Sequence, residues 1–242
     1  MTDRAVAQAG EAREHLALAL DVDDLVVALR LARRLRPWFG IAKVGLELFG
    51  AAGPETVSAL TVEGYRVFLD LKLHDIPTTV GRAARVLGGH GVAFATVHTQ
   101  GGEAMLRAAV EGMAEGAAAA GAPEPCVLGV TVLTSDAVAP PEVLAARAGL
   151  AAAAGCGGLV CAAADLGVTR RAAPGLVTVV PGIRPAGAGT DDQARAATPA
   201  GAVTAGADVL VVGRAVTAAP DPEVVAQALC AEVNSAVFAR RG

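Results

Sequence analysis

The stretch FLDLKLHDIP, residues 68–77, predicts an apolar strand that ends in charged residues and leads directly into a helix. The apolar run up to Leu69 is typical of a buried strand, and Pro77 suits the first turn of the helix that follows. Asp70 and Lys72 are two residues apart, so their side chains point to the same side of an extended strand. The stretch therefore indicates a strand, a charged turn and a helix in succession.

The charges of this stretch also suggest chemistry. Asp75 joins Asp70 and Lys72, which places two carboxylates and an ammonium at the end of one strand. Such a cluster is typical of a site that handles protons, although a solvated turn with an incidental ion pair has the same spacing. His74, and His98 at the end of a later strand, are interpreted as hydrogen-bonded structural histidines.

Apolar runs and helical patterns alternate along the whole chain. Each run is nearly continuous, as expected for parallel strands that are covered on their outer face. A (β/α)₈ barrel has eight strands, each followed by a helix, and this chain has the same number. The predicted strands lie at 16–20, 41–44, 67–71, 94–97, 127–132, 158–161, 177–180 and 209–212, and the predicted helices near 24–35, 54–63, 78–89, 103–119, 141–154, 164–173, 198–205 and 222–239.

The fold class predicted is therefore α/β, a single TIM barrel. The 242 residues, 53% of them hydrophobic, suffice for one large core. An open doubly wound sheet would need a glycine-rich turn after the first strand, where residues 20–24, LDVDD, are acidic instead. We expect residues 1–14 to be a polar N-terminal segment and residues 15–242 to form one catalytic barrel domain.

Composition excludes several classes of partner. A net charge of −4 argues against a nucleic acid or an anionic membrane held by bulk charge. Residues 1–14 do not resemble an export signal, and glycines and charges interrupt every long apolar run, so we expect a cytoplasmic protein. No metal-ligand cluster or cofactor motif is present, and the cysteines have no ligand or redox spacing: Cys126, Cys156, Cys161 and Cys230.

In a TIM barrel, functional groups follow the carboxyl ends of the strands. Lys43 lies within an otherwise apolar strand, where an unpaired ammonium is costly, so we expect a partner such as Asp70. Asp21 follows the first strand. It either belongs to the site or caps the next helix, a task that Asp23 or Asp24 would serve as well.

A phosphate site is predicted after the seventh and eighth strands. Residues 181–193 form a loop rich in glycine and proline, with Arg184 at one end and Gln193 at the other. Gly213 and Arg214 hold the matching place after the eighth strand. Phosphate sites of TIM barrels form there, and arginine makes charge-assisted bonds to phosphate. The loop is either an ordinary surface loop or one that closes over the ligand.

With these residues assembled, nearly the whole chain resembles the orotidine 5′-phosphate decarboxylase family. The specific segments are residues 68–77, VTVLTS at 130–135, PGIRP at 181–185 with DDQ at 191–193 and Arg195, and KVG at 43–45. Val180, Asp136 and the pair Thr99-Gln100 depart from the usual pattern, which affects base contacts and strand-end packing but removes no charged group.

The resemblance implies decarboxylation of orotidine 5′-monophosphate to UMP, without cofactor or metal, in de novo pyrimidine synthesis. It implies a catalytic array of Lys43, Asp70, Lys72 and Asp75, with Lys72 protonating the C6 carbanion that the site stabilises electrostatically. It also implies a homodimer in which Asp75 reaches the neighbouring active site. The implied substrate contacts are Asp21, Lys43, Asp70, Ile76, Thr79, Thr134, Ser135, Arg184, Gln193, Gly213 and Arg214.

Two other functions remain open at this point. Sugar-phosphate relatives such as hexulose-phosphate synthase share the Asp-x-Lys-x-x-Asp strand but use Mg²⁺ and, as a rule, an acidic residue where Lys43 stands. A barrel that binds a phosphate ligand without catalysis is the other alternative. The full charged array argues against it, because a binder gains nothing from burying two carboxylates beside a substrate carboxylate.

Overall fold

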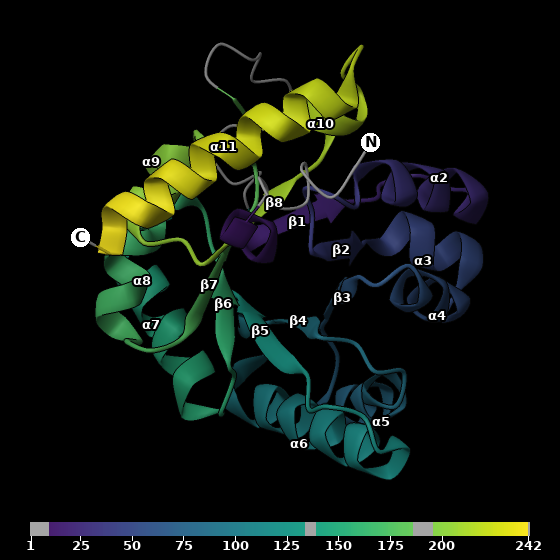
Figure 1. Cartoon of the computed structure of the whole chain (residues 1–242). Helices are drawn as coiled ribbons and strands as arrows, with labels where there is room; N and C mark the ends of the chain where they lie inside the picture. The colour runs from purple at the N-terminus through teal and green to yellow at the C-terminus, as the bar shows by residue number, and fades with distance from the viewer. Residues whose placement is uncertain (1–9, 134–138, 186–195, 242) are drawn as a thin grey trace.

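Eight parallel strands close into a barrel surrounded by helices (Figure 1). The structure is a computed structural model that describes residues 10–133, 139–185 and 196–241. Each strand pairs in parallel with the next one along the chain, and β8 pairs with β1 to close the ring, with Ala17 opposite Val211. The predicted TIM barrel is therefore confirmed.

The strands match the predicted positions closely, and the predicted bounds 41–44, 177–180 and 209–212 are those of the structure. The main addition is the short helix α3, which precedes α4 where one helix was predicted. The strands are β1 (Leu16–Ala19), β2 (Ile41–Val44), β3 (Arg66–Leu73), β4 (Phe94–His98), β5 (Cys126–Val130), β6 (Gly158–Val160), β7 (Val177–Val180) and β8 (Val209–Val212).

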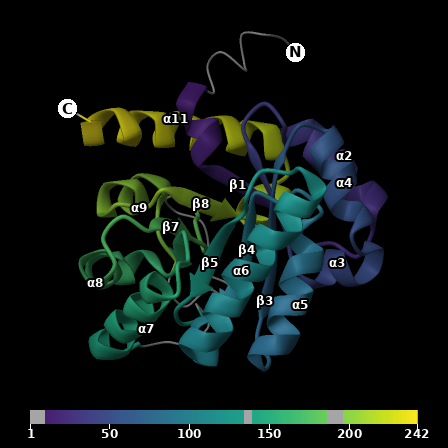
Figure 2. The same ribbon diagram turned by 90° about the horizontal axis from the view of Figure 1, so that it is seen from below.

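The described helices follow the strands in order and pack on the outside of the barrel (Figures 1 and 2). They are α2 (Leu25–Leu35), α3 (Leu46–Ala52), α4 (Glu55–Val62), α5 (Pro77–Gly88), α6 (Gly102–Ala120), α7 (Pro141–Ala153), α8 (Leu166–Ala172), α9 (Pro199–Ala205), α10 (Arg214–Thr217) and α11 (Pro222–Arg241), with the 3₁₀ turns η1 (Gly10–His15), η2 (Thr99–Gly101) and η3 (Ala163–Asp165).

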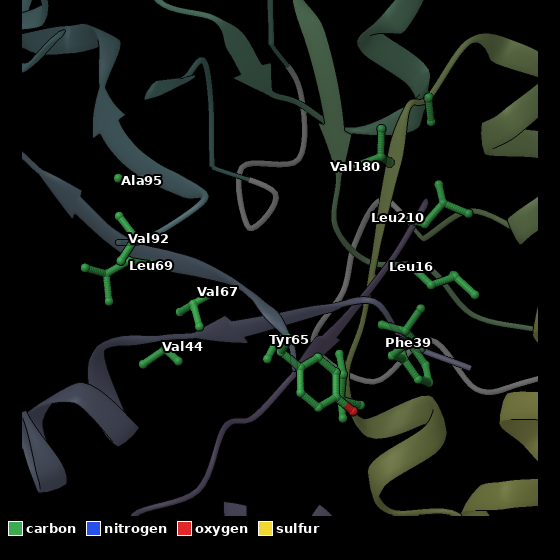
Figure 3. Close-up of a cluster of buried hydrophobic side chains, with 14 of the residues drawn as sticks. Leu16, Phe39, Val44, Tyr65, Val67, Leu69, Val92, Ala95, Val180 and Leu210 are labelled. Carbon is green, nitrogen blue, oxygen red and sulfur yellow. The ribbon is translucent and has the colours of Figure 1, made fainter. Parts of the chain in front are cut away.

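The core has two layers because side chains alternate along each strand. In β1, Leu16 and Leu18 face the surrounding helices, while Ala17 and Ala19 face the barrel interior. Figure 3 shows part of the outer layer, with Phe39 and Tyr65 among its larger members. The interior layer contains side chains from all eight strands: Ala17, Ala19, Ile41, Phe68, Phe94, Leu128, Val130, Val160, Val179, Val209 and Val211.

The amino-terminal end of the barrel is covered. The turn η1 precedes β1 and packs against α11, which lies across this end of the molecule (Figure 2). The backbone N–H of Ala12 donates to Oδ1 of Asn234 at 2.8 Å and ties the two together. The opposite, carboxyl end is therefore left for a site. No helix in the described part of the chain is long and apolar enough to cross a bilayer.

Candidate active site

A cavity of about 370 Å³ opens at the carboxyl ends of the strands. The alternation that turns Ala19, Ile41 and Phe68 inward brings the residues two positions further along each strand, Asp21, Lys43 and Asp70, to the cavity wall. The interior layer thus changes from apolar to charged at the level where the strands end. Apolar residues of β5 and β6 line the opposite wall.

Four charged side chains of alternating sign form a continuous chain in this cavity. Nζ of Lys43 lies 2.8 Å from Oδ1 of Asp21 and 3.8 Å from Oδ2 of Asp70. Nζ of Lys72 lies 2.9 Å from Oδ1 of the same Asp70. The side chains of Lys43 and Asp70 are only 11% and 14% exposed, so each nearly buried charge has an opposite charge as its partner. The predicted pairing of Lys43 with Asp70 is present, but Asp21 is the closer carboxylate.

The helix-cap alternative for Asp21 is excluded by a neighbouring residue. Oδ1 of Asp24 accepts a hydrogen bond from the backbone N–H of Val27 at 2.9 Å and caps α2, so Asp21 is not the cap. Gly45 leaves room for the Asp21–Lys43 pair, because a Cβ there would lie 3.1 Å from Nζ of Lys43 and 3.2 Å from Oδ1 of Asp21. Gly45 is part of the segment KVG at 43–45 that carries the family resemblance, but this spatial role was not predicted.

Asp70 and Lys72 meet, but not on a regular strand. The β3–β4 pairing changes register between Leu69 and Leu73. Lys72 has φ +52°, and among the residues described it is the only non-glycine with a positive φ. That left-handed conformation is disfavoured for a residue with a Cβ, and residues with such strained backbones cluster at functional sites. The backbone at Lys72 is therefore held in a conformation that the sequence pattern did not predict.

The loop from β3 to α5 carries the remaining predicted charge away from this cavity. Asp75 is exposed, and its Oδ1 accepts a hydrogen bond from the backbone N–H of Ile76 at 2.6 Å. Ile76 is 66% exposed and Thr79 is exposed as well. Among the described residues, the ion pairs of the charged chain do not include Asp75. Pro77 begins α5, as predicted.

Basic and glycine residues of the last two strand ends line the other side of the cavity. Arg184, Gly213 and Arg214 all border it, and Arg214 begins α10 with Gly213 as its N-cap. Two backbone hydrogen bonds close the base of the predicted loop. The N–H of Arg184 donates to the carbonyl oxygen of Ala197 at 3.0 Å, and the N–H of Ala197 donates to the carbonyl oxygen of Gly182 at 3.3 Å. Three predicted contacts lie outside the described residues: Gln193, Thr134 and Ser135.

His98 and the cysteines have structural surroundings, whereas His74, predicted to be a structural histidine as well, is exposed. The buried His98 accepts a hydrogen bond at Nδ1 from the N–H of Gln100, and its ring stacks on that of His74 with centroids 5.4 Å apart. Burial raises the pKa of Cys126 to about 11 and that of Cys156 to about 12, so both thiols are still less ready to form a thiolate than an ordinary cysteine. Within the described ranges, no three His, Cys, Asp or Glu side chains are grouped to hold a metal ion.

One further residue contacts the charged chain. Thr96 of β4 donates from its hydroxyl to Oδ1 of Asp70 at 3.1 Å and accepts the backbone N–H of Lys72 at 2.9 Å. Thr96 is not one of the predicted site residues. Its spacing of two from the inward-facing Phe94 was the available signal, since it predicts an inward position one layer below the site.

Fold and site together define a TIM-barrel enzyme whose cavity carries alternating carboxylates and ammonium groups at the carboxyl ends of its strands. The family model described as "Orotidine 5′-phosphate decarboxylase / HUMPS family" matches residues 14–229. The chain therefore belongs to the orotidine 5′-phosphate decarboxylase / HUMPS family.

Individual relatives agree with this membership. An orotidine 5′-phosphate decarboxylase of Anaeromyxobacter sp. (strain K) is 50% identical over 229 residues, which are 90% of this chain and 97% of the relative. That of Moorella thermoacetica is 46% identical over 235 residues, 92% of this chain and 93% of the relative. The crystal structure of orotidine 5′-phosphate decarboxylase from Lactobacillus acidophilus has a TM-score of 0.77 and 33% identity, and the match covers 91% of this chain and 99% of that one.

Proposed function

We propose that the protein removes CO₂ from orotidine 5′-monophosphate to give UMP in pyrimidine biosynthesis, by charge placement alone. The observation that carries the proposal is the chain of ion pairs Asp21–Lys43–Asp70–Lys72 at the mouth of the barrel. Its support is twofold: curated relatives that are about half identical have the name of this enzyme, and the cavity suits a small molecule.

The decarboxylation requires that the site stabilise a carbanion. Loss of CO₂ from C6 of the pyrimidine leaves a negative charge that the ring does not delocalise. Lys72 is the proposed cation beside C6, and its ammonium then donates the proton that completes UMP. Asp70, fixed by Lys43 and Lys72, would lie near the departing carboxylate and disfavour the bound substrate relative to the transition state. Preorganised charges in a nearly buried site are the main source of the proposed rate enhancement.

The rest of the substrate would be held around this array. Asp21 and Lys43 would bind the ribose hydroxyls. Arg184, Gly213 and Arg214, on the same cavity, would bind the phosphate. Binding energy from the phosphate, remote from C6, would assemble the site around the reacting carbon. Gln193, Thr134 and Ser135, from segments outside the described residues, are proposed to complete the phosphate and base contacts.

We further propose that two copies of the chain share their active sites. Asp75, Ile76 and Thr79 are exposed beside the cavity rather than within it, which suits residues that contact the partner's substrate. Ile76 is 66% exposed, so its side chain is free to contact a second copy of the chain. A cytoplasmic location is proposed on the basis of the pathway.

A magnesium-dependent reaction on a sugar phosphate is the second candidate, because the family description includes both groups of enzymes. Lys43 disfavours it, since its ammonium lies between two carboxylates that a cation would otherwise bind. One assay separates the two candidates: the loss of orotidine 5′-monophosphate absorbance in the presence of EDTA. Undiminished decarboxylation with EDTA is expected. Abolition by EDTA, or absence of any decarboxylation, would contradict the proposal.

A further inference from the structure

Thr96 lies directly beneath the charged chain and is 1% exposed. Its hydroxyl contacts two members of the chain at once: it accepts the backbone N–H of Lys72 at 2.9 Å and donates to Oδ1 of Asp70 at 3.1 Å. The same Oδ1 receives the ammonium of Lys72 at 2.9 Å. Backbone and side chain of Lys72 are thus both linked to Asp70, the first through Thr96 and the second directly.

The position of Thr96 in the sheet explains why a side chain, and not the backbone, accepts the N–H of Lys72. Leu69 pairs with Ala95 and Leu73 pairs with Val97, so three residues of β3 stand opposite Thr96 alone. Such a bulge removes regular ladder partners from the longer strand. The hydroxyl of Thr96 replaces the missing acceptor for the N–H of Lys72, in the middle of the bulge.

We propose that Thr96 is a positioning residue: its hydroxyl holds Lys72 in the left-handed conformation and orients Asp70, so that the ammonium meets the carboxylate. This inference rests on the roles of Asp70 and Lys72 in the proposed function. Only a group that donates and accepts at the same time can make both hydrogen bonds. Serine retains such a hydroxyl group, whereas valine has nearly the same shape as threonine but no hydroxyl. Thr96 itself is buried and is not among the residues that line the cavity.

The first test compares Thr96→Val with Thr96→Ser. Because a bond to a charged group is lost and Lys72 is misplaced, kcat of Thr96→Val should fall roughly ten- to a hundredfold. KM for orotidine 5′-monophosphate should change less than about threefold, because ribose and phosphate contacts remain. Thr96→Ser should recover most of kcat. If Thr96→Val is insoluble, Thr96→Ala replaces it in the comparison.

Thr169→Val is the matched control. Thr169 is also fully buried, and its hydroxyl donates to the helix carbonyl of Asp165 at 3.1 Å, away from the cavity. This variant should lose thermal stability, as Thr96→Val does, while keeping the kcat of the wild type. An equal fall of kcat in Thr169→Val would show that loss of a buried hydroxyl alone slows the enzyme, and would overturn the assignment of Thr96.

The second test asks whether Thr96 acts through Lys72. In a Lys72→Ala background, Thr96→Val should cost less than about threefold in kcat, because coupled residues are not additive. An undiminished second loss, or wild-type kcat in Thr96→Val alone, would overturn the inference. If the unmodified protein does not decarboxylate orotidine 5′-monophosphate, the proposed function fails and this inference with it. If it does, and Lys72→Ala is slow, a normal Thr96→Val contradicts the positioning role alone.

Discussion

Asp70 is the residue on which the contacts of the site converge. Its carboxylate receives the ammonium of Lys72 at 2.9 Å and the hydroxyl of Thr96 at 3.1 Å, with the ammonium of Lys43 at 3.8 Å from the other oxygen. A buried charge is tolerated when partners on several sides compensate its lost hydration. Those partners also fix the direction of the carboxylate in the cavity.

At the same scale, the phosphate contacts can be tested by a comparison of substrates. Arg214 borders the cavity, and a charge-assisted bond to phosphate is worth roughly 1.5–3 kcal/mol, or about ten- to a hundredfold. Arg214→Ala should lower kcat/KM for orotidine 5′-monophosphate by that factor and hardly change the slow reaction of the nucleoside orotidine. Steady-state kinetics with both substrates measures the contrast. Equal losses of kcat/KM with both substrates would mean that Arg214 contributes to the chemical step or to folding, and not to phosphate binding.

Strand periodicity predicts some of these residues and not others. Lys43 was detectable because an ammonium interrupts an apolar strand, and Asp70 because charge begins where the strand ends. The roles of Thr96 and Gly45 were not, because the inward spacing of Thr96 from Phe94 is shared by ordinary core residues, and Gly45 appeared only as part of the segment at 43–45. Their roles depend on a bulge in the neighbouring strand and on the approach of two side chains, which no local pattern records.

At the scale of elements, glycines let α5 and α6 pack side by side (Figure 2). A Cβ at Gly116 would lie 1.9 Å from the carbonyl oxygen of Arg85, and one at Gly112 would lie 2.3 Å from that of Gly81. The two backbones are therefore in direct contact at these positions. Since α5 starts immediately after Asp75 and Ile76, this packing also fixes where their loop ends.

Gly116→Ala should destabilise the protein by about 1–3 kcal/mol or more, because a backbone carbonyl cannot yield to the added methyl group. Urea unfolding measures the change in the free energy of unfolding. Gly149→Ala is the control: this residue is also within a helix, α7, but nothing lies within 4 Å of an added Cβ. In Gly149→Ala the free energy of unfolding should rise by roughly 0.5–1 kcal/mol, because alanine has the higher helix propensity. Similar values for the two variants would contradict the close packing of α5 and α6.

Helix and strand positions were largely predictable, but connections were less so. The pattern over 54–63 gave α4, while α3, seven residues that follow β2 directly, was missed. Its N-cap is Gly45, which makes no side-chain cap, so the usual start signal is absent. Similarly, β3 extends to Leu73, because the bulge at Lys72 lets pairing resume beyond the charged residues.

At the scale of the whole molecule, the proposed dimer predicts complementation. If Asp75 acts in the partner's site, inactive Lys72→Ala and inactive Asp75→Asn subunits should regain activity on mixing. A mixed dimer collects both changes in one site and leaves the other intact, so up to about a quarter of wild-type activity is expected after random exchange. No recovery, with subunit exchange confirmed independently, would place Asp75 in the site of its own subunit.

Buried thiol and phenol groups make the stability of the whole fold depend on pH in the alkaline range. Burial raises the pKa of Cys126, Cys156 and Cys230 from 9.0 to about 11, 12 and 11, and raises that of Tyr65 as well. The folded state therefore keeps protons that the unfolded chain releases. Their contribution to stability is complete below pH 9 and is lost as the pH rises through about 11 to 12.

Thermal unfolding at pH 8 and pH 10.5 tests this expectation. The Tm of the wild type should fall between the two pH values, and it should fall less in a variant with alanine at positions 126, 156 and 230. An equal fall in both proteins would mean that the buried thiols do not contribute to the alkaline sensitivity of the fold.

The central claim is that Lys72, within a fixed array of charges, performs a decarboxylation without a cofactor. The most direct measurement is the turnover of orotidine 5′-monophosphate by Lys72→Ala, with circular dichroism and UMP binding as evidence of an intact fold and site. Loss of both the stabilising charge and the proton donor should slow decarboxylation at least about a thousandfold, while UMP still binds. Near-normal turnover in this folded, UMP-binding variant would contradict the account.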